Sequence, residues 1–433
     1  MRLKVRLSYL LVIAVWCVPF SVSGNPRAEK PAGIRAGGFL LHPGGDLSFG
    51  FDSYVKDLWK SSGVMDSVRD GYLEAGASFR TRLEDEVQHS WNNSFRYGYR
   101  QYFGAGAGDS DYAMNALIRS EGDIFKLSLL RGEVVGQYRY SDTPEDDFMN
   151  RSYTNHDVLA GASLYIQPGE GKVISQKFGY RFHMTLFSEF HSLSSMEHQI
   201  SSLTRWNFLP FTSMTLLIDS RFFSYMKSVR DVVTSEVPGS EALPSYNLDS
   251  RPLRAKYGIQ GLMLSSLSFG VNAGYGYSFF VKRSGFSAPN EHYFLFDAFL
   301  KYYFTEDISI KGSYRYDFHP YYGGLYRYHQ ADLEFSAEFW RHFLIDIELR
   351  YQYLAFKIQD EVEGSETASA KPTIFRNDHH VGLVFEAGYR IWEGFKVSAS
   401  YELRSYMGRY LCGGLPDPDY NRHLALLKVI YEY

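Results

Sequence analysis

The sequence predicts an all-β protein, a transmembrane antiparallel up-and-down β-barrel of about 18 strands. Three observations support this fold class: long segments that alternate with a period of two, connections that alternate between short and long, and an alternating C-terminus that ends on an aromatic residue. The aromatic content of 17%, with 35 Tyr and 33 Phe, suits a protein with rings at two membrane–water interfaces. The weakest alternation lies in 47–55 and 112–120. If both segments are not strands, the count falls to about 16.

The N-terminus is typical of a secretory signal peptide. Basic residues at 2, 4 and 6 precede an apolar stretch over 10–20, and small residues follow at 22–24. We therefore expect a signal peptide over 1–24 and a single barrel domain over 25–433. After Gly24 no window of about 18 uninterrupted apolar residues occurs, so the sequence predicts no membrane-spanning helix.

Two-residue periodicity is clearest from Leu267 to Phe279. The odd positions there are aliphatic or aromatic, apart from one alanine, and the even positions are Ser, Gly or Asn. Two faces of this kind indicate a strand with one apolar and one polar side. The pattern recurs in 177–186, 308–318, 330–339 and 395–404. These runs of about 9–14 residues suit a tilted membrane strand, whereas soluble strands average about 5–6.

The connections between these runs alternate in length. Short turns are expected at Leu83–Glu86, Ser120–Asp123, Gln167–Lys172, Leu209–Phe211, Leu264–Ser266, Thr305–Asp307, Trp340–His342 and Trp392–Gly394. Longer polar or Gly-rich stretches are expected at Lys56–Ser67, Ser141–Ser152, Lys227–Leu248, Lys282–Asn290, Lys357–Arg376 and Tyr410–Asp419. Short periplasmic turns and long outer loops are the rule for outer-membrane barrels. An even strand number, counted from Leu47, then places both termini in the periplasm of a Gram-negative bacterium.

The C-terminal strand indicates two partners. Leu427, Val429, Tyr431 and Tyr433 alternate up to the last residue, and this ending resembles the signal that the outer-membrane assembly machinery reads on its barrel clients. We therefore expect this machinery as a partner during biogenesis and outer-membrane lipid as the permanent environment. The net charge of −4 gives no indication of a nucleic-acid partner, and the oligomeric state stays open.

A soluble β-sandwich or propeller is the alternative fold. Its strands would also alternate, but with water on the polar face and a second apolar layer elsewhere in the chain. Here one face is aromatic or aliphatic on strand after strand, which favours the membrane barrel.

The polar face of a membrane barrel is its functional face. Ten charged residues are the candidates for lining the lumen: Arg80, Arg82, Arg96, Arg100, Lys311, Arg315, Asp332, Glu334, Asp346 and Glu348. A basic arc opposite an acidic arc would set a transverse field that orients charged solutes. The alternative is that these residues pair across neighbouring strands and only tolerate a wet interior.

No catalytic or metal motif stands out, so we expect no enzyme activity, cofactor or bound metal. The adjacent His379 and His380 would point to opposite faces of a strand and could not chelate one metal together. The glycines of 104–108 lack the Lys and helix of a phosphate loop, and Asp417 and Asp419 lack the ligand density of a calcium site. Cys412 is the only cysteine after the signal segment, so no internal disulfide can form.

The N-terminal part resembles a family of β-barrel porins found in proteobacteria. The resemblance lies in Phe39–Pro43, a short lead into a first strand over Leu47–Ser53, and in the segment from Tyr72 to Phe103. Tyr54 departs from the family pattern, in which Asn often follows the Asp-Ser pair. The resemblance implies an outer-membrane barrel often called a porin, and some such barrels are thought to accompany exopolysaccharide export.

Together these features predict a passive channel for small hydrophilic solutes. One alternative is a structural or exopolysaccharide-export-associated barrel whose lumen is closed by an inward loop such as Lys227–Leu248. Another is an outer-membrane hydrolase, for which only His183 and His423 can be named. The roughly 20 residues between the signal segment and the first strand are too few for a plug or periplasmic domain, which disfavours energy-coupled transporters and assembly or secretion barrels.

Overall fold

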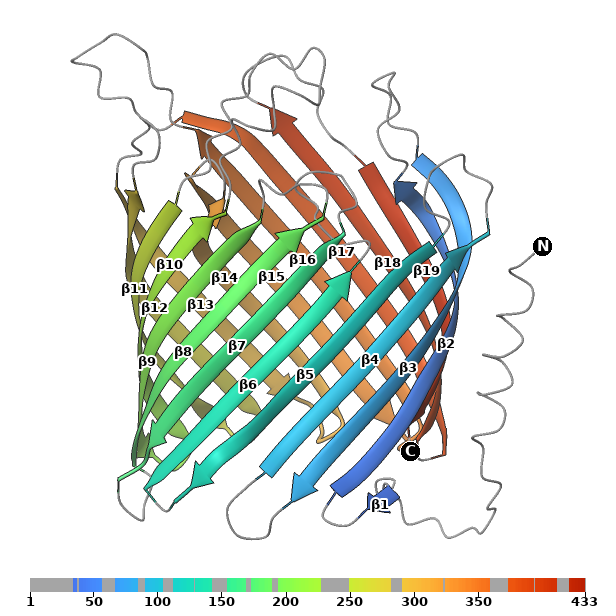
Figure 1. Ribbon diagram of the computed structural model, residues 1–433, viewed down its shortest axis with the longest axis horizontal. Coiled ribbons are helices and arrows are strands. Elements are labelled where there is room, and N and C mark those ends of the chain that lie inside the picture. The colour runs from blue at the N-terminus through green and yellow to red at the C-terminus, as the bar shows by residue number, and fades with distance from the viewer. Residues whose placement is uncertain are drawn as a thin grey trace.

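The computed structural model is a closed antiparallel β-barrel of 18 strands with one short extra strand, β1 (Figure 1). The structure describes residues 34–36, 39–56, 67–84, 90–103, 112–127, 129–141, 154–168, 173–188, 194–226, 249–281, 290–321, 324–358, 373–392, 394–410 and 420–432. The predicted signal peptide lies outside these residues. No helix among them is long and apolar enough to cross a membrane.

The strands are long and strongly tilted in Figure 1, as a barrel that crosses a membrane requires. In chain order they are β1 (Ile34–Ala36), β2 (Phe39–Lys56), β3 (Ser67–Glu84), β4 (Ser90–Tyr102), β5 (Tyr112–Lys126), β6 (Leu130–Ser141), β7 (Asn155–Ile166), β8 (Ile174–Phe187), β9 (Ser195–Leu209), β10 (Thr212–Tyr225), β11 (Asp249–Leu264), β12 (Leu267–Val281), β13 (Glu291–Tyr303), β14 (Ile308–Tyr321), β15 (Gly324–Phe339), β16 (Phe343–Ile358), β17 (Thr373–Trp392), β18 (Phe395–Tyr410) and β19 (Tyr420–Glu432).

The barrel closes where β19 pairs with β2, from Leu424 opposite Asp52 to Glu432 opposite Gly44. Every other strand from β2 to β19 pairs with the strands before and after it in the chain, so each has two neighbours. A sheet closed in this way has no free edge, and its backbone N–H and C=O groups are paired within the ladder. Such pairing is required within the hydrocarbon part of a membrane, where no water is present to bond with the backbone.

The first barrel strand begins earlier than the sequence indicates. The predicted lead segment Phe39–Pro43 already belongs to β2, where Pro43 is opposite Phe79 of β3. On the other side of β2, pairing with β1 ends at Leu41 and pairing with β19 begins at Gly44. Proline, which has no N–H to donate, therefore occupies a gap between two ladders, the kind of edge position that a strand tolerates.

Most of the short connections lie at one end of the barrel, the end that also holds β1 and the end of β19 (Figure 1), while the short β14–β15 connection lies at the opposite end. The predicted turns at 209–211, 264–266, 305–307, 340–342 and 392–394 are confirmed, and the connection at 167–172 separates β7 from β8 as expected. Trp340 and Arg341 have φ values of 52° and 62°, the pair of left-handed residues that a tight type I′ hairpin turn needs. The predicted turn at 83–86 overlaps β3, which extends to Glu84.

The predicted turn at Ser120–Asp123 is wrong, because these residues lie inside β5. These residues are polar or small because of their neighbours on the adjacent strands. Asp123 accepts hydrogen bonds from Ser90 and Arg131, and Gly122 lies under the Trp91 ring. The chain reverses after Lys126, where the Leu127 amide donates to the Leu130 carbonyl. The predicted long stretches join strands at the opposite end, and their central parts lie outside the described residues, as do the glycines of 104–108, Asp417 and Asp419.

The two faces of the barrel wall have an inverted pattern of exposure. On β2, Phe49 is 57% exposed, whereas Ser48 and Asp52 on the other face are buried at 2% and 1%. The same inversion places exposed Phe385 and buried Asp378 on β17. We call the two sides the apolar face and the polar face. Because buried charge and exposed rings are the reverse of a water-soluble fold, the apolar face is suited to lipid.

Closure of the barrel at the β2–β19 seam can be tested with paired cysteines. In a C412S background, L47C with V429C places two thiols directly opposite each other on the apolar face. Their Cα separation of about 4.5–5.5 Å lies within disulfide range. Mild oxidation should give an intramolecular cross-link, read as a shift on denaturing gels. L47C with V397C on β18 is the control and should stay uncrosslinked, and equal cross-linking of both pairs would contradict the seam.

Candidate functional site

The polar face carries its densest group of buried charges on strands β9 to β14. Arg254 lies at the centre: its Nε donates to Asp219 at 3.1 Å and its Nη1 donates to Asp317 at 3.2 Å. These three side chains are only 8%, 2% and 9% exposed. A buried guanidinium between two carboxylates is stable only when its geometry satisfies both partners. Arg254 therefore fixes the spacing between β10 and β14.

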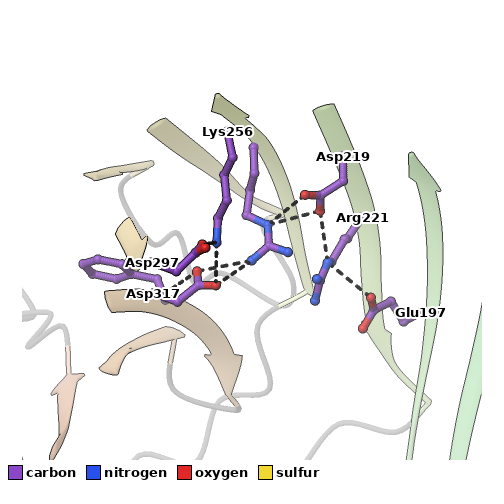
Figure 2. A network of polar contacts seen from close by, with 8 residues as sticks. Glu197, Asp219, Arg221, Lys256, Asp297 and Asp317 are labelled. Carbon is purple, nitrogen blue, oxygen red and sulfur yellow. Dashed lines mark hydrogen bonds and ion pairs between the residues drawn. The ribbon is translucent and has the colours of Figure 1, made fainter. Parts of the chain in front are cut away.

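Further charged residues join this group at Asp219 and at Asp317, and Figure 2 labels six of its members. Lys256 Nζ contacts Asp297 at 3.1 Å and Asp317 at 3.5 Å. Arg221 Nε lies 3.3 Å from Asp219 and 3.6 Å from Glu197. Four carboxylates and three cations thus form one connected set, which we call the Arg254 network: Glu197, Asp219, Arg221, Arg254, Lys256, Asp297 and Asp317.

The small side chains of β12 make these long contacts possible. Arg254 and Lys256 on β11 reach β13 and β14 by passing over the polar face of β12, which carries Gly274 and Gly276 at this level. A Cβ atom on Gly274 would lie 2.8 Å from Cγ of Lys256, and one on Gly276 would lie 2.0 Å from the Tyr293 ring. The glycines that give 267–279 its clean alternation are therefore covered by the side chains of neighbouring strands.

An aromatic cluster adjoins the Arg254 network. Tyr293, Leu295 and Phe318 are buried together, and the Tyr293 and Phe318 rings stack at 4.8 Å. The Phe318 amide donates to Asp317 at 2.8 Å, which ties this cluster to the charged group. The cluster supports the network from the β13–β14 side.

The ten predicted lumen-lining residues lie on β3, β4 and β14 to β16, and most of them pair with an opposite charge. Arg100 contacts Glu74 at 2.8 Å, Lys311 contacts Glu334 at 2.8 Å, and Arg350 joins Asp332 at 2.9 Å. The remaining pairs are Arg96 with Asp46, Arg80 with Glu432, and Arg350 with Glu348. Pairing across and along strands, the second of the two alternatives, therefore describes most of these positions.

Arg82, Arg315 and Asp346 complete the ten. Each shares a register row with other residues of the polar face; Arg315, for example, is opposite Asp297 on β13. The Arg80 pair has a structural role as well, since Glu432 is on β19 and the contact passes over β2 at the closing seam. None of the ten belongs to the Arg254 network.

The sequence interpretation missed the Arg254 network because its members lie far apart in the chain. Asp219 and Asp317 are separated by two long connections, and no local spacing links them. One signal was present in the sequence. A strand face of only Ser, Gly and Asn, as in 268–278, leaves space that long side chains on the neighbouring strands must fill.

The histidines named in the sequence do not form a hydrolytic or metal site together. His183 Nε2 lies 3.5 Å from Asp157 on the polar face, whereas His423 contacts the Tyr401 hydroxyl on the apolar face. His379 and His380 point to opposite faces as predicted, toward Tyr351 and Tyr406 respectively. Within the described ranges, no group of three or more His, Cys, Asp or Glu side chains is placed to hold a metal ion.

Three solved structures are similar to this chain at low sequence identity. The FrpB iron transporter of Neisseria meningitidis (F5-1 variant, apoprotein form) is 8% identical, with a TM-score of 0.48 over 90% of this chain and 81% of that chain. OpdK of Pseudomonas aeruginosa, solved with vanillate, is 8% identical, with a TM-score of 0.46 over 91% and 99%. OccAB3 of Acinetobacter baumannii is 9% identical, with a TM-score of 0.45 over 91% and 99%. No protein-family model matches the chain, and no curated protein matches it in sequence.

The Arg254 network should make a large contribution to stability. We expect R254M to lower the free energy of unfolding by about 3–5 kcal/mol, because Asp219 and Asp317 would stay buried and keep only their longer contacts to Arg221 and Lys256. R80M, which removes a pair that is 61% and 50% exposed, should cost no more than about 1 kcal/mol. Urea titration of the protein folded into vesicles measures both values, and adding D219N and D317N to R254M should restore part of the loss. Equal losses in R254M and R80M would contradict the buried network.

The glycine surface of β12 gives a second test. G276A should destabilise the barrel by about 1–3 kcal/mol, because the new methyl group overlaps the Tyr293 ring. G312A on β14 is the matched control, since nothing lies within 4 Å of its added Cβ. The same urea titration applies, and an unchanged G276A would show that Tyr293 does not cover Gly276.

Proposed function

We propose that this protein is an outer-membrane channel for small hydrophilic solutes, with the polar face lining a water-filled lumen. The inverted exposure of the two faces carries the proposal. Buried aspartates at 52, 219 and 378 occupy one side of the wall, and exposed rings such as Phe49 and Phe385 occupy the other. A closed wall with this polarity separates lipid outside from water inside. The short turns at the end that holds β1 and the end of β19 support a periplasmic location for that end.

The ten charged residues predicted from the sequence line the lumen in this proposal. Alternation assigns them to the polar face, as with Glu334, which shares a row with Lys311 and Glu348. Because most of these charges are paired, each pair acts as a local dipole on the wall. A solute that passes along the wall leaves its polar contact with one pair and makes a similar contact with the next. Transport is then passive diffusion, and the lumen width and these dipoles decide which solutes enter.

The Arg254 network also lies along this path, and Glu197, Arg221 and Asp297 are its most exposed side chains, at 18%, 22% and 27%. Its members come from β9, β10, β11, β13 and β14, so one sector of the wall presents cations and carboxylates side by side. Solutes that carry both a donor and an acceptor group match this pattern better than solutes of a single charge. This sector is our candidate for the selectivity-determining part of the wall.

Thiol modification of adjacent residues tests the lumen assignment. In a C412S background, E334C should react with a charged, membrane-impermeant thiol reagent and change the single-channel conductance in a planar bilayer. Leu333 precedes Glu334 on the same strand but lies on the apolar face, and it is 46% exposed in the structure. L333C should show no conductance change, because lipid covers this position. A steady open-channel current in the unmodified protein is the first expected result. Silence at all voltages, or the same response from both variants, would contradict the channel.

A further inference from the structure

The apolar face carries a repeated pair of side chains, a tyrosine whose hydroxyl contacts Nδ1 of a histidine on the next strand. In the part of the chain that the structure describes, this pair occurs six times. The pairs, which we call the Tyr–His belt, are Tyr138–His156, Tyr180–His198, Tyr275–His292, Tyr314–His329, Tyr351–His379 and Tyr401–His423. The oxygen–nitrogen distance is 2.7 or 2.8 Å in five of them.

All six pairs lie toward the end of the barrel that bears the long connections. Each histidine is close to the start of a strand that begins at that end; His292, for example, is the second residue of β13. Directly opposite His292 is Tyr277, and the two rings lie 4.4 Å apart. At the other end of the apolar face, exposed tryptophans such as Trp206 and Trp392 mark the second boundary. The belt therefore lies along one rim of the apolar face, between β6 and β19.

The contact between the tyrosine hydroxyl and Nδ1 fixes the orientation of each imidazole ring and therefore of its second nitrogen, Nε2. When the hydroxyl donates to Nδ1, the ring proton resides on Nε2. The Nε2 atoms of the six histidines have no hydrogen-bond partner among the described residues. An N–H donor left without an acceptor in hydrocarbon costs several kcal/mol. The belt must therefore lie at the level of the lipid headgroups, where acceptors are present.

A permanent cation continues the belt where a Tyr–His pair is missing. Between β10 and β11, Arg251 occupies the corresponding place on the apolar face, with its guanidinium 5.8 Å from the centre of the Phe222 ring. Donor or cationic groups thus occur on each such strand pair from β6 to β19. On β4–β5 the equivalent contact is between Tyr97 and the Met114 sulfur, and on β2 the Phe49 ring stacks on Phe103. These two pairs offer no donor of this kind.

We propose that the Tyr–His belt, together with Arg251, binds the phosphate groups of lipid headgroups in the leaflet at the long-connection end. Phosphate oxygens accept charge-assisted hydrogen bonds from imidazole N–H and guanidinium groups, which neutral sugar headgroups without a phosphate cannot match. Among the described residues of β2 to β5 no Tyr–His pair of this kind occurs, so this arc leaves phosphate-bearing lipid free to exchange. The proposal rests on the membrane placement given above but not on channel activity.

Lipid retention by the intact barrel tests the belt. The full chain in detergent micelles is incubated with lipid A as the phosphate-bearing probe, or with galactosyl diacylglycerol, which has no phosphate. Retained lipid is counted by native mass spectrometry. We expect the unaltered protein to retain lipid A preferentially, and the variant H292F/H329F/H379F/H423F to lose this preference by about tenfold, the loss of roughly one charge-assisted hydrogen bond. Galactolipid retention should not change.

The control variant is H342F, which removes a histidine from the short-turn end, where Nδ1 of His342 contacts the Arg390 carbonyl. It should retain lipid A as the unaltered protein does. An unaltered protein without preference for lipid A overturns the proposal whatever the variants do, as does a quadruple variant that retains lipid A normally. Conductance of the same samples is measured separately, so that a failed channel and a failed lipid site give different results.

Discussion

The structure depends on one constraint, that each backbone amide and carbonyl within a bilayer needs a partner inside the protein. A closed ladder from β2 to β19 meets it, and the seam between these two strands is therefore as important as any interior contact. The seam is reinforced on the polar face, where Arg422 donates to Asp52 at 2.7 Å and Lys428 contacts Asp46 at 3.2 Å. Closure then leaves every side chain only two directions, toward lipid or toward the interior.

Those two directions explain why the buried part of this protein is charged. A single-layered wall has no second sheet to form an apolar core, and only a few aromatic residues, such as Tyr293 and Phe318, cluster inside. On the inner surface of the wall, long polar side chains pair with each other instead, as in the Arg254 network. Glycines on β12 give these side chains the space to reach strands that are not adjacent.

The barrel itself could be predicted from the sequence because its strands are long and regular. Alternation in 267–279 predicts one apolar and one polar face on a single strand, and the structure places all of these residues in β12. The prediction failed where local polarity was taken as a turn, at Ser120–Asp123, because one polar face of a strand resembles a loop over so few residues. It also failed at Phe39–Pro43, which the family resemblance suggested as a lead segment but which belongs to β2, where Pro43 occupies a gap between two ladders.

The sequence by itself determined the period, the two faces and the alternation of connections, since each is set by neighbours in the chain. Only the tertiary structure decided which charged side chains form ion pairs and which tyrosines form a hydrogen bond with a histidine. Arg254 reaches Asp317 across two intervening strands, and each Tyr–His pair depends on the register between two strands. A shift of one residue in that register would turn the partner side chain to the other face. Contacts of this kind have no spacing in the chain to reveal them, because closure and register, which are properties of the whole barrel, create them.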